Sequence, residues 1–514
     1  MPSAALLVVG SVAWGLGFGW NVVACSSSDE GPAPLSSQGS ADAYWPPQDA
    51  AGVVGDAGLG PGSDVGGSVV DGGSTDGNGG VRDGASSDGD GAVDAGANTS
   101  PDTGPDTGPD ARRDAGPDAG PDAGPDAGPD VFEPTCTSPV AWTLETIGPT
   151  IDVPSVAMDP SGRFHTVFAK NSGTGLFYAW RDDGGQGSES AGLGFNMGLG
   201  PKLAVGDDRS LHIAASAPSE TDSSASDLRY ITRSTSGVWR SEVLEPTVRG
   251  RFDIARAESG ALAVLLGSGV EPYPVVLFVR SASGGTWQRT VVVEETDFEP
   301  AVSVSFAGEK LHLAYTIVEG VKETAWYAEG DSAADLSHTS VYEVERRDVS
   351  AVPMAVDREG GVHLALSHLS ISFPNNTWHF EGGLKYAYRS PVDGTWHIED
   401  VEDAVANLDA TTSIWDGEVP GLDPSIGLDP LGGTYLSYAV IGTEDIRFAR
   451  RDAGGHWHRS HAFDHGLLLS FPNRVAAPFV IDGTGRVWIA HKEVDSTAHA
   501  SVVRWGRTCL STVQ

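Results

Sequence analysis

Apolar and polar residues alternate over short runs in the C-terminal part of the chain, and each run ends in a Gly or Asp turn. The clearest example spans residues 352–401, which read VPMAVDREGGVHLAL and, after a polar insertion, LKYAYRSPVDGTWHIEDV. Alternation with a period of two is typical of half-buried strands. We therefore expect four strands here, one ending at Asp357 and three carrying His363, Tyr386 and Trp396.

The same four-strand unit recurs along the chain, with a period of roughly 45–60 residues, the size of one propeller blade. Its copies cover residues 154–185, 201–245, 252–294, 300–345, 352–401, 424–463 and 477–508. The pattern predicts an all-β, seven-bladed β-propeller with four-stranded blades. Six blades with one degenerate copy remain an alternative.

The seventh unit lacks its fourth strand, and a matching strand lies at the other end of the domain. AWTLETIG at residues 141–148 resembles GVWRSEVL at 237–244. We expect this N-terminal strand to complete the last blade and close the ring, which removes free sheet edges. Cys136 and Cys509 flank the closure, and in an exported protein they can form a disulfide. Two separate thiols are the alternative.

Three regions follow from composition. Residues 4–24 are almost wholly apolar and end at Cys25, so residues 1–25 are predicted to be a secretory signal. A single transmembrane anchor is the alternative. Residues 26–133 are rich in Gly, Pro, Asp and Ala and end in AGPD repeats, which predicts a disordered, extended stalk. Residues 134–514 form the propeller domain.

The net charge of the chain restricts the kinds of molecule that it can bind. The formal charge of the chain is -38, and residues 26–130 contribute 20 acidic and 3 basic side chains. Such acidity excludes nucleic acid and electrostatic binding to anionic lipid.

Asp88, Asp90 and Asp94 resemble calcium ligands, but no Glu closes the loop. No phosphate loop, paired-Cys motif or nucleophile elbow occurs, so the sequence predicts no cofactor.

Residues that recur at equivalent positions of several blades are predicted to be structural. We expect the second-strand residues to bond neighbouring turns, the turn aspartates to cap backbone N–H groups, and the tryptophans to pack between blades. The second-strand residues are His165, His212, His312 and His363, replaced by Leu262, Tyr435 and Trp488 in three units. The turn aspartates are Asp159, Asp357, Asp429 and Asp482, and the tryptophans are Trp239, Trp287, Trp396 and Trp457.

Features that do not recur are better candidates for function. The fifth unit contains the insertion SHLSISFPNNTWHFEGG with Trp378 and His379, and the following connection contains Trp415, Asp416 and Glu418. Tryptophan beside carboxylates suits a sugar site, because the ring stacks on the pyranose and the carboxylates accept its hydroxyls. Asp416 and Glu418 are also the only catalytic candidates. A loop that folds back on its blade is the alternative.

A histidine-rich run, HWHRSHAFDH, closes the sixth unit. His456 and His458 are two residues apart and would share a strand face, which could hold a transition metal. Because outer strands face solvent, adventitious binding is the alternative for this pair and for the neighbouring His461 and His465.

The repeat P-S-x-A-x-D-x-x-G-x-x-H followed by L-x-Y-A and G-x-W resembles BNR-like and sialidase-like seven-bladed propellers over residues 137–510. That resemblance implies the fold. Arg163, Arg280 and Arg389 lie at repeat or turn positions, which favours packing over a sialidase arginine triad.

VVAC at residues 22–25 resembles a bacterial lipobox, which implies that Cys25 is lipidated. The lipobox with the AGPD tract resembles myxobacterial lipoproteins, and Ser26 implies the outer membrane.

These observations predict a monomeric cell-envelope lipoprotein, anchored by its N-terminal lipid alone, whose propeller binds a carbohydrate or a surface protein without catalysis. One alternative is a glycoside hydrolase or polysaccharide lyase with a central cleft. The other is a structural scaffold of the envelope.

Overall fold

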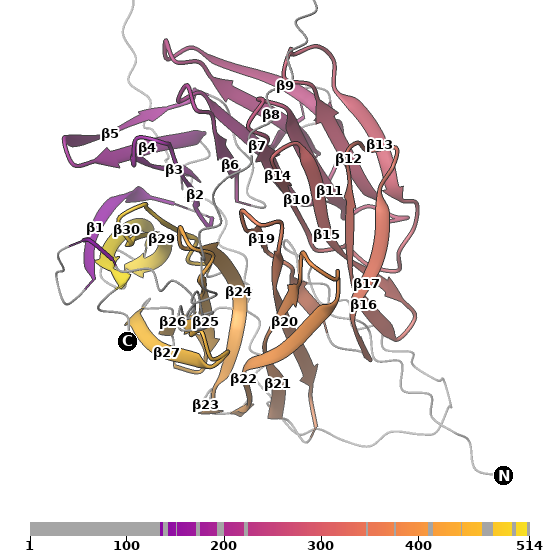
Figure 1. Cartoon of the computed structure of the whole chain (residues 1–514). Coiled ribbons are helices and arrows are strands. Elements are labelled where there is room, and N and C mark those ends of the chain that lie inside the picture. The colour runs from indigo at the N-terminus through magenta and orange to yellow at the C-terminus, as the bar shows by residue number, and fades with distance from the viewer. Residues whose placement is uncertain are drawn as a thin grey trace, which may run out of the picture. The chain divides into compact units, whose positions relative to one another are not determined.

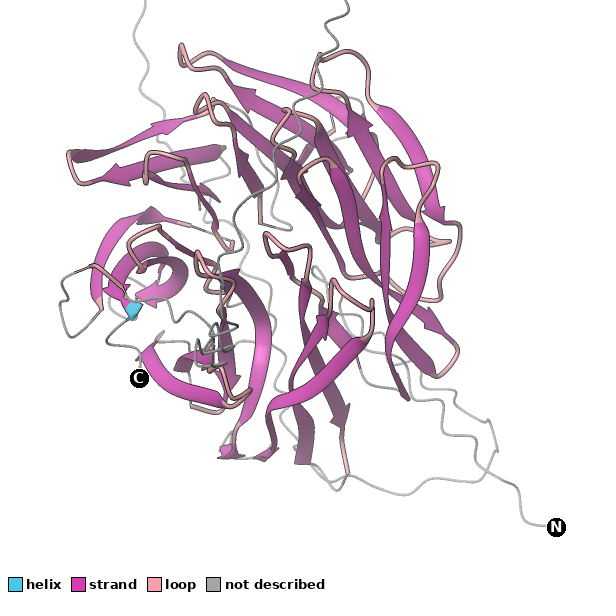
Figure 2. Ribbon diagram, in the orientation of Figure 1, coloured by secondary structure: helices cyan, strands magenta, loops and turns pink. Residues whose placement is uncertain are grey.

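The computed structural model describes most of residues 134–510, with short gaps. The described ranges are 134–136, 142–150, 152–170, 175–192, 200–219, 225–345, 348–374, 377–409, 415–443, 445–464, 476–495 and 500–510. They form strands and loops almost throughout (Figure 2). Within these ranges no helix has the length and apolarity needed to cross a membrane. Cys25, the stalk and Asp88, Asp90 and Asp94 lie outside them.

The strands group into seven antiparallel sheets, one for each predicted repeat (Figure 1). Blades 1 to 4 consist of Ser155–Met158 (β2), Phe164–Ala169 (β3), Leu176–Asp182 (β4), Gly185–Ser190 (β5); Lys202–Val205 (β6), Leu211–Pro218 (β7), Ser226–Arg233 (β8), Trp239–Glu245 (β9); Gly250–Arg256 (β10), Leu262–Ser268 (β11), Val275–Arg280 (β12), Gln288–Val293 (β13); and Val302–Ala307 (β14), Lys310–Glu319 (β15), Lys322–Gly330 (β16), Ser337–Glu345 (β17). Blades 5 to 7 consist of Asp348–Ala351 (β18), Met354–Val356 (β19), Val362–Ser372 (β20), Thr377–Arg389 (β21), Trp396–Asp409 (β22), Trp415–Gly417 (β23); Val419–Leu428 (β24), Thr434–Ile441 (β25), Asp445–Arg451 (β26), Trp457–Asp464 (β27); and Phe479–Ile481 (β28), Arg486–Asp495 (β29), Ala500–Cys509 (β30) with Thr143–Pro149 (β1). The prediction of seven blades is confirmed.

The blades form a closed ring through their first strands. These strands contact one another in sequence, β2 with β6, β6 with β10, β10 with β14, β14 with β19, β19 with β24, β24 with β28, and β28 with β2. Blade 5 departs from four strands: its first strand is split into β18 and β19, and β23 is added outside β22. The extra strand arises from the insertion and connection that the sequence sets apart.

Closure of the ring follows the prediction. β1 pairs antiparallel with β30, so the N-terminal strand completes blade 7 (Figure 1). Its bounds are Thr143–Pro149 rather than 141–148. Cys136 and Cys509 form a disulfide across 373 residues, which confirms the predicted bridge. The bridge ties the two ends of the domain together at the blade where closure occurs.

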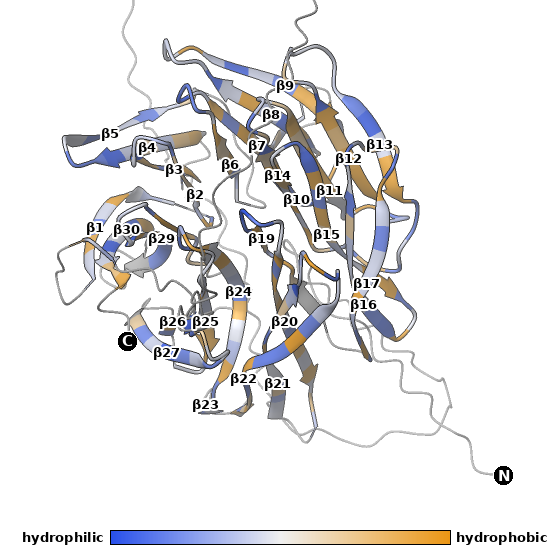
Figure 3. Cartoon of the chain, in the orientation of Figure 1, coloured by the Kyte–Doolittle hydropathy of each residue, from blue (hydrophilic) through white to orange (hydrophobic). Residues whose placement is uncertain are grey.

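The hydrophobic core is divided into clusters that lie between adjacent blades. One example joins Leu176 and Tyr178 of blade 1 to Leu211 and Ile213 of blade 2, and equivalent clusters occupy the other six junctions. Figure 3 shows β11 and β12 largely orange, whereas the outer strands β17 and β22 alternate between blue and orange. This is the expected result when inner strands are covered on both sides and outer strands on one.

The meander gives the ring two distinct faces. Turns between first and second strands, and between third and fourth strands, end on one face, here called the Asp-turn face because it holds Asp159 and its equivalents. Turns between second and third strands and the links between blades end on the opposite face. The cavity described below is lined by turns of the Asp-turn face, and the insertion of blade 5 extends from the opposite one.

Candidate functional site

A histidine on the second strand pairs with a tyrosine on the third strand in four blades. His165 Nδ1 lies 2.8 Å from the Tyr178 hydroxyl oxygen in blade 1. The corresponding distance is 2.6 Å in three further pairs, His212 with Tyr230, His312 with Tyr327, and His363 with Tyr386. The sequence prediction of a structural role is confirmed for this side of each imidazole.

In blades 1, 2 and 5 the other imidazole nitrogen meets the turn before the second strand. His165 Nε2 lies 3.4 Å from Asp159 Oδ2, and His363 Nε2 lies 3.2 Å from Asp357 Oδ2. In blade 2 His212 Nε2 lies 2.9 Å from the hydroxyl of Ser210. The predicted bond between ring and turn is confirmed for His212 and His363. At His165 the 3.4 Å contact lies within ion-pair range and makes no hydrogen bond.

Blades 6 and 7 use another ring at the same position. The Tyr435 hydroxyl donates to Asp429 at 3.2 Å, and the Trp488 indole N–H donates to Asp482 at 3.4 Å. In blade 3 the strand register corrects the sequence analysis: Ala263 occupies this position rather than Leu262. The alanine side chain has no N–H or O–H group, so the turn of blade 3 does not need a side-chain acceptor for it.

The turn aspartates cap backbone N–H groups, as predicted. Asp159 Oδ1 accepts from the N–H groups of Ser161 and Arg163 at 2.9 and 3.0 Å. Asp429 and Asp482 accept equivalent pairs of N–H groups, and Asp357 accepts that of Gly361 at 2.6 Å. Such capping fixes a five-residue loop between the first and second strands.

Arginine and tryptophan tie neighbouring blades together. Arg233 of blade 2 and the Trp239 indole both donate to Glu189 of blade 1, at 2.5 and 2.9 Å. The blade 3 to blade 2 and blade 6 to blade 5 junctions repeat this arrangement, with Arg280, Trp287 and Glu242, and with Arg451, Trp457 and Glu399. The prediction that the recurrent tryptophans pack between blades is confirmed, because each ring contacts a tyrosine of the preceding blade.

The three arginines raised by the sialidase resemblance do not converge. Arg163 pairs with Asp182 inside blade 1 at 2.6 Å, and Arg280 pairs with Glu242 at 2.7 Å. Arg389 pairs with Glu329 of blade 4 at 3.1 Å. One ion pair lies within blade 1 and the other two lie at separate junctions between blades, in agreement with the packing role that their repeat positions favour.

Blade 4 departs from the repeat at one place. Four residues separate the paired Phe306 and Leu311, whereas five separate Met158 and Phe164 of blade 1. The shorter turn, AGEK, contains no aspartate. Gly330 pairs with Leu311 on the neighbouring strand. In the blades that have an inter-blade arginine, the arginine occupies this position.

The carboxylate of blade 4 is also displaced. Blades 1, 2 and 5 carry the inter-blade glutamate on the fourth strand, but blade 4 has Thr339 there, opposite Tyr327. Its glutamate is Glu329, on the third strand opposite His312. Trp396 of blade 5 loses its partner as a result, and its buried indole N–H has no hydrogen bond among the described residues.

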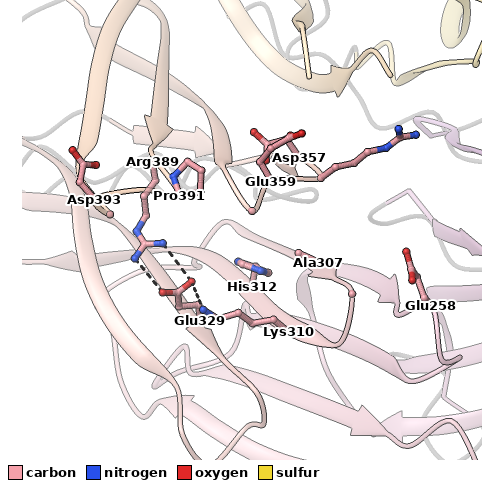
Figure 4. A pocket seen from close by; sticks show the side chains of 14 residues that line it. Glu258, Ala307, Lys310, His312, Glu329, Asp357, Glu359, Arg389, Pro391 and Asp393 are labelled. Atoms are coloured by element: carbon pink, nitrogen blue, oxygen red, sulfur yellow. Dashed lines mark hydrogen bonds and ion pairs between the residues drawn. The ribbon is translucent and has the colours of Figure 1, made fainter. Parts of the chain in front are cut away.

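A polar cavity of about 860 Å³ lies where blade 4 departs from the repeat. It is lined by the first turns of blades 3, 4 and 5 and by the turn between the third and fourth strands of blade 5 (Figure 4). Its charged lining residues are Glu258, Lys310, Glu329, Asp357, Arg358, Glu359, Arg389 and Asp393, and His312 lines it as well. Its volume falls within the range of small-molecule sites, about 300–1,000 Å³.

Glu329 is the centre of the charged network in this cavity. It accepts from Lys310 at 2.9 Å, from Arg389 at 3.1 Å and from the Tyr327 hydroxyl at 2.9 Å. Burial alone would raise the pKa of Glu329, but the hydrogen bonds from Lys310 and Tyr327 outweigh it and hold the pKa below its ordinary value. The carboxylate is therefore ionised at neutral pH and holds both cations at the wall of the cavity (Figure 4).

His312 is the one second-strand histidine in the described blades without a turn partner. Its side chain is 2% exposed, and its Nε2 has no hydrogen bond among the residues that the structure describes. Burial lowers the pKa of His312 to about 4, so the ring is neutral at pH 7. A neutral, buried imidazole with an open ring nitrogen thus lines a cavity of ionised groups.

The predicted site residues of blade 5 lie on a sheet extension. In the strand register, Trp378 and Trp415 both pair with Leu408, and His379 and Asp416 both pair with Asn407. Because neighbouring residues of a strand point to opposite faces, Trp378 and His379 are on different sides. The insertion therefore pairs with its own blade, where it lengthens β20, β21 and β22 and adds β23.

The two sides of this extension differ in character. Trp378 packs partly buried against an apolar cluster with Phe380 and Val419, and its ring centroid is 4.4 Å from that of the half-exposed Phe373. On the other side, His379 Nδ1 lies 2.8 Å from the side-chain oxygen of Asn407, and Asp416 is exposed.

Glu418 is engaged in an ion pair between blades 5 and 6. Its carboxylate lies 2.6 Å from Arg447, which also pairs with Glu402 on β22. β23, which carries Asp416, is the outermost strand of blade 5. Asp416 is thus on an outer strand and Glu418 in an ion pair, and a catalytic role for either carboxylate stays a prediction.

His456 and His458 both approach the carboxylate of Asp452. His456 lies in the turn before β27, and its Nδ1 is 3.5 Å from Asp452 Oδ1. His458 Nε2 is 2.8 Å from Asp452 Oδ2. No group of three or more metal-ligating side chains occurs in the described ranges; His465 lies outside them.

Comparison with known proteins leaves the family open. No protein family matches the sequence, and a search of curated proteins finds no relative. Similar solved structures include the lectin BP39L from Burkholderia pseudomallei, with 10% identity over 70% of this chain and 96% of that one and a TM-score of 0.48. They also include α-L-arabinanase from Penicillium chrysogenum bound to arabinobiose (13% identity, 60% and 93% coverage, TM-score 0.39).

A third similar structure is the six-bladed propeller lectin from Aleuria aurantia, described with a fucose recognition mode (13% identity, 62% and 97% coverage, TM-score 0.36). Identities of 10 to 13% and TM-scores of 0.36 to 0.48 transfer no activity to this chain. Its function has to be inferred from its own site.

Sequence reasoning missed the cavity, although one signal for it was present. The fourth repeat reads SFAGEKLHLAY where the first reads AMDPSGRFHTV, so the missing aspartate and the shorter turn are visible in the sequence. The place of Glu329 beside Arg389 was not visible, because it depends on the contact between two blades.

Proposed function

We propose that the propeller binds a carbohydrate, without catalysis, in the cavity at blade 4. The observation that carries this proposal is the coincidence of the cavity with the break in the repeat. A repeated residue needs only to pack, whereas blade 4 lacks the turn aspartate and the inter-blade arginine and carries its glutamate on another strand, so it loses some of the repeated stabilising contacts. A ligand that occupies the resulting space would account for that loss.

The mixed chemistry of the cavity favours a polyhydroxylated ligand. Lys310, Arg358 and Arg389 supply donors, and Glu329, Asp357 and Glu359 supply acceptors. Each sugar hydroxyl donates and accepts a hydrogen bond, so it can use both kinds of group. Five lining carboxylates oppose a polyanion, and an apolar ligand would leave these ions desolvated without partners.

The aromatic pair on blade 5 is a second candidate for the carbohydrate site. Phe373 is 47% exposed beside Trp378, and an exposed aromatic face can stack on a sugar ring. Trp415, His379 and Asp416 belong to the same sheet extension. We retain this surface as the second location that the binding experiment must separate from the cavity.

We further propose that the domain is displayed at the cell envelope. The apolar N-terminal run, the lipobox-like VVAC ending at Cys25, and the stalk rich in Gly, Pro and Asp support a lipid-anchored protein, held away from an outer membrane of the type found in myxobacteria. In this arrangement the two faces of the propeller would be free to meet polysaccharide as a monomer. Mass spectrometry of the mature protein tests whether Cys25 carries lipid.

A glycan array tests the binding function. The wild-type protein should bind at least one glycan, and His312→Phe should weaken that binding while the Trp378→Ala/Trp415→Ala double variant retains it. Fucosides and arabinan oligosaccharides belong on the array as probes. Loss in the double variant alone would move the site to blade 5, and a folded wild type that binds no glycan would contradict the proposal.

A further inference from the structure

The hydrogen-bond chain at blade 4 fixes the position of the imidazole proton on His312. Tyr327 has a single hydroxyl proton, and it is donated to Glu329 Oε2 at 2.9 Å. The contact between Tyr327 Oη and His312 Nδ1 is 2.6 Å, so its proton must come from Nδ1. Because the neutral ring has one N–H, Nε2 is then a lone-pair acceptor.

The other three histidines have the opposite arrangement. His165 and His363 direct Nε2 at the carboxylates of Asp159 and Asp357, which can only accept. In blade 2 the Ser210 hydroxyl donates to Asp208 at 2.6 Å, and therefore accepts from His212 Nε2 at 2.9 Å. These three rings carry the proton on Nε2, and their tyrosines donate to Nδ1.

We propose that His312 is the ligand's hydrogen-bond acceptor: its Nε2 accepts a hydrogen bond from a hydroxyl of the bound sugar, and the hydrogen bonds from Nδ1 through Tyr327 to Glu329 keep Nε2 without a proton for that role. This proposal rests on the carbohydrate-binding function proposed above and specifies how the same cavity selects its ligand. A sugar with a free hydroxyl at this point is bound, and one with a methoxy group there is rejected.

The surroundings of His312 support this role. The ring is buried, its Nδ1 is engaged by Tyr327, and His312 is among the residues that line the cavity. The turn that would occupy this space in other blades is held elsewhere: Glu309 of blade 4 accepts from the N–H and hydroxyl of Ser259 in blade 3, at 3.0 and 2.6 Å. Ser259 and Glu309 thus anchor the short turn against the neighbouring blade.

The tautomers can be tested without any ligand. In the full-length protein with ¹⁵N-labelled histidine, long-range ¹H–¹⁵N correlation spectra distinguish Nδ1–H from Nε2–H rings. We expect Nδ1–H for His312 and Nε2–H for His165, His212 and His363. Tyr327→Phe removes the acceptor of the relay and should reduce the Nδ1–H population of His312, whereas Tyr178→Phe should leave His312 unchanged. An Nε2–H ring at His312 in the wild type would overturn the inference.

Binding on the glycan array supplies the second readout. His312→Phe should reduce affinity for the bound glycan by about tenfold, the effect of one hydrogen bond, and His165→Phe should not reduce it. If the two variants bind equally well, the acceptor role is wrong while the carbohydrate-binding function stands. If the wild type binds no glycan, the binding function itself is wrong and the acceptor role falls with it.

Discussion

Blades 4 and 5 place the same histidine in two different surroundings. His363 of blade 5 lies between the Tyr386 hydroxyl and the Asp357 carboxylate, at 2.6 and 3.2 Å. His312 of blade 4 has the tyrosine and lacks the aspartate. In blade 5 both imidazole nitrogens of His363 have partners within the protein. In blade 4 the Nε2 atom of His312 has none among the described residues, and the ring lines a cavity. In a repeat protein, function is best sought where a repeated contact is missing.

The most direct way to remove this difference is to give blade 4 the turn of blade 5. Replacing the AGEK turn at 307–310 with DREGG should provide His312 with a carboxylate and fill part of the cavity. Because both the acceptor and the space are lost, we expect carbohydrate affinity to fall by more than about 100-fold. Calorimetric titration measures the affinity. The same turn sequence is native to blade 5, so the unfolding midpoint of the variant should not fall; undiminished binding would contradict the account.

A second prediction compares the two kinds of turn in stability. Asp429→Ala in blade 6 removes the acceptor of two backbone N–H groups and of Tyr435. We expect a loss of about 2–3 kcal/mol in the free energy of unfolding, since buried donors are left without partners. Glu309→Ala in the exposed turn of blade 4 should cost about 1 kcal/mol or less. Urea unfolding of both variants checks the ranking, and equal losses would show that the aspartate turns are not special.

The buried histidines predict how stability depends on pH. Burial lowers the pKa of His165, His212 and His312 to about 4, from 6.5 in the unfolded chain. Between these values the unfolded state binds more protons, so the stability that the neutral rings permit is present above pH 6.5 and is lost as the pH falls toward 4. Each ring should contribute about 1 kcal/mol for the unit from pH 6 to pH 5.

The same substitution at His165 and at His312 tests whether the two histidines contribute equally to this pH dependence. His165→Phe and His312→Phe should each reduce the pH slope of the unfolding free energy by a similar amount, as measured by urea unfolding at several pH values. Aromatic rings fit this position, as Tyr435 and Trp488 show in blades 6 and 7. A slope that neither variant changes would mean that the pKa of these histidines is the same in the folded and unfolded states.

The smallest expected effect concerns one cation at the rim of the cavity. Lys310 pairs with Glu329 at 2.9 Å and is 44% exposed, so Lys310→Ala should weaken carbohydrate binding by about threefold, in keeping with a partly exposed ion pair. Lys322 forms a comparable exposed pair with Glu343 on the same blade, and Lys322→Ala should leave the affinity unchanged. Identical affinities for the two variants would remove Lys310 from the site.

Much of the fold could be predicted from the sequence because each blade repeats the same local pattern. The alternation of strands, the Asp turns and the unpaired strand at residues 141–148 led to seven blades and to the Cys136–Cys509 bridge. The insertion of blade 5 was less predictable. Its pairing as β20 to β23 depends on register between segments that carry no repeat, and a shift of one residue exchanges the faces of Trp378 and His379.

The cavity could not be derived from the sequence for a related reason. Glu329 faces Arg389 and Lys310 only because blades 4 and 5 are neighbours and because Glu329 pairs with His312. Sequence reasoning grouped His312 with the other second-strand histidines, and that grouping holds for its Tyr327 contact alone. The absence of an aspartate in AGEK carried the remaining information.

The measurement that tests the central claim most directly is the affinity of the array-selected glycan for two glutamate variants of the full-length protein. Glu329→Ala removes the centre of the cavity network, and Glu399→Ala removes the equivalent inter-blade tie to Arg451 at the next junction. We predict that Glu329→Ala loses at least about tenfold in affinity while Glu399→Ala binds as the wild type does. Equal binding by both variants would show that the break in the repeat at blade 4 is not the carbohydrate site.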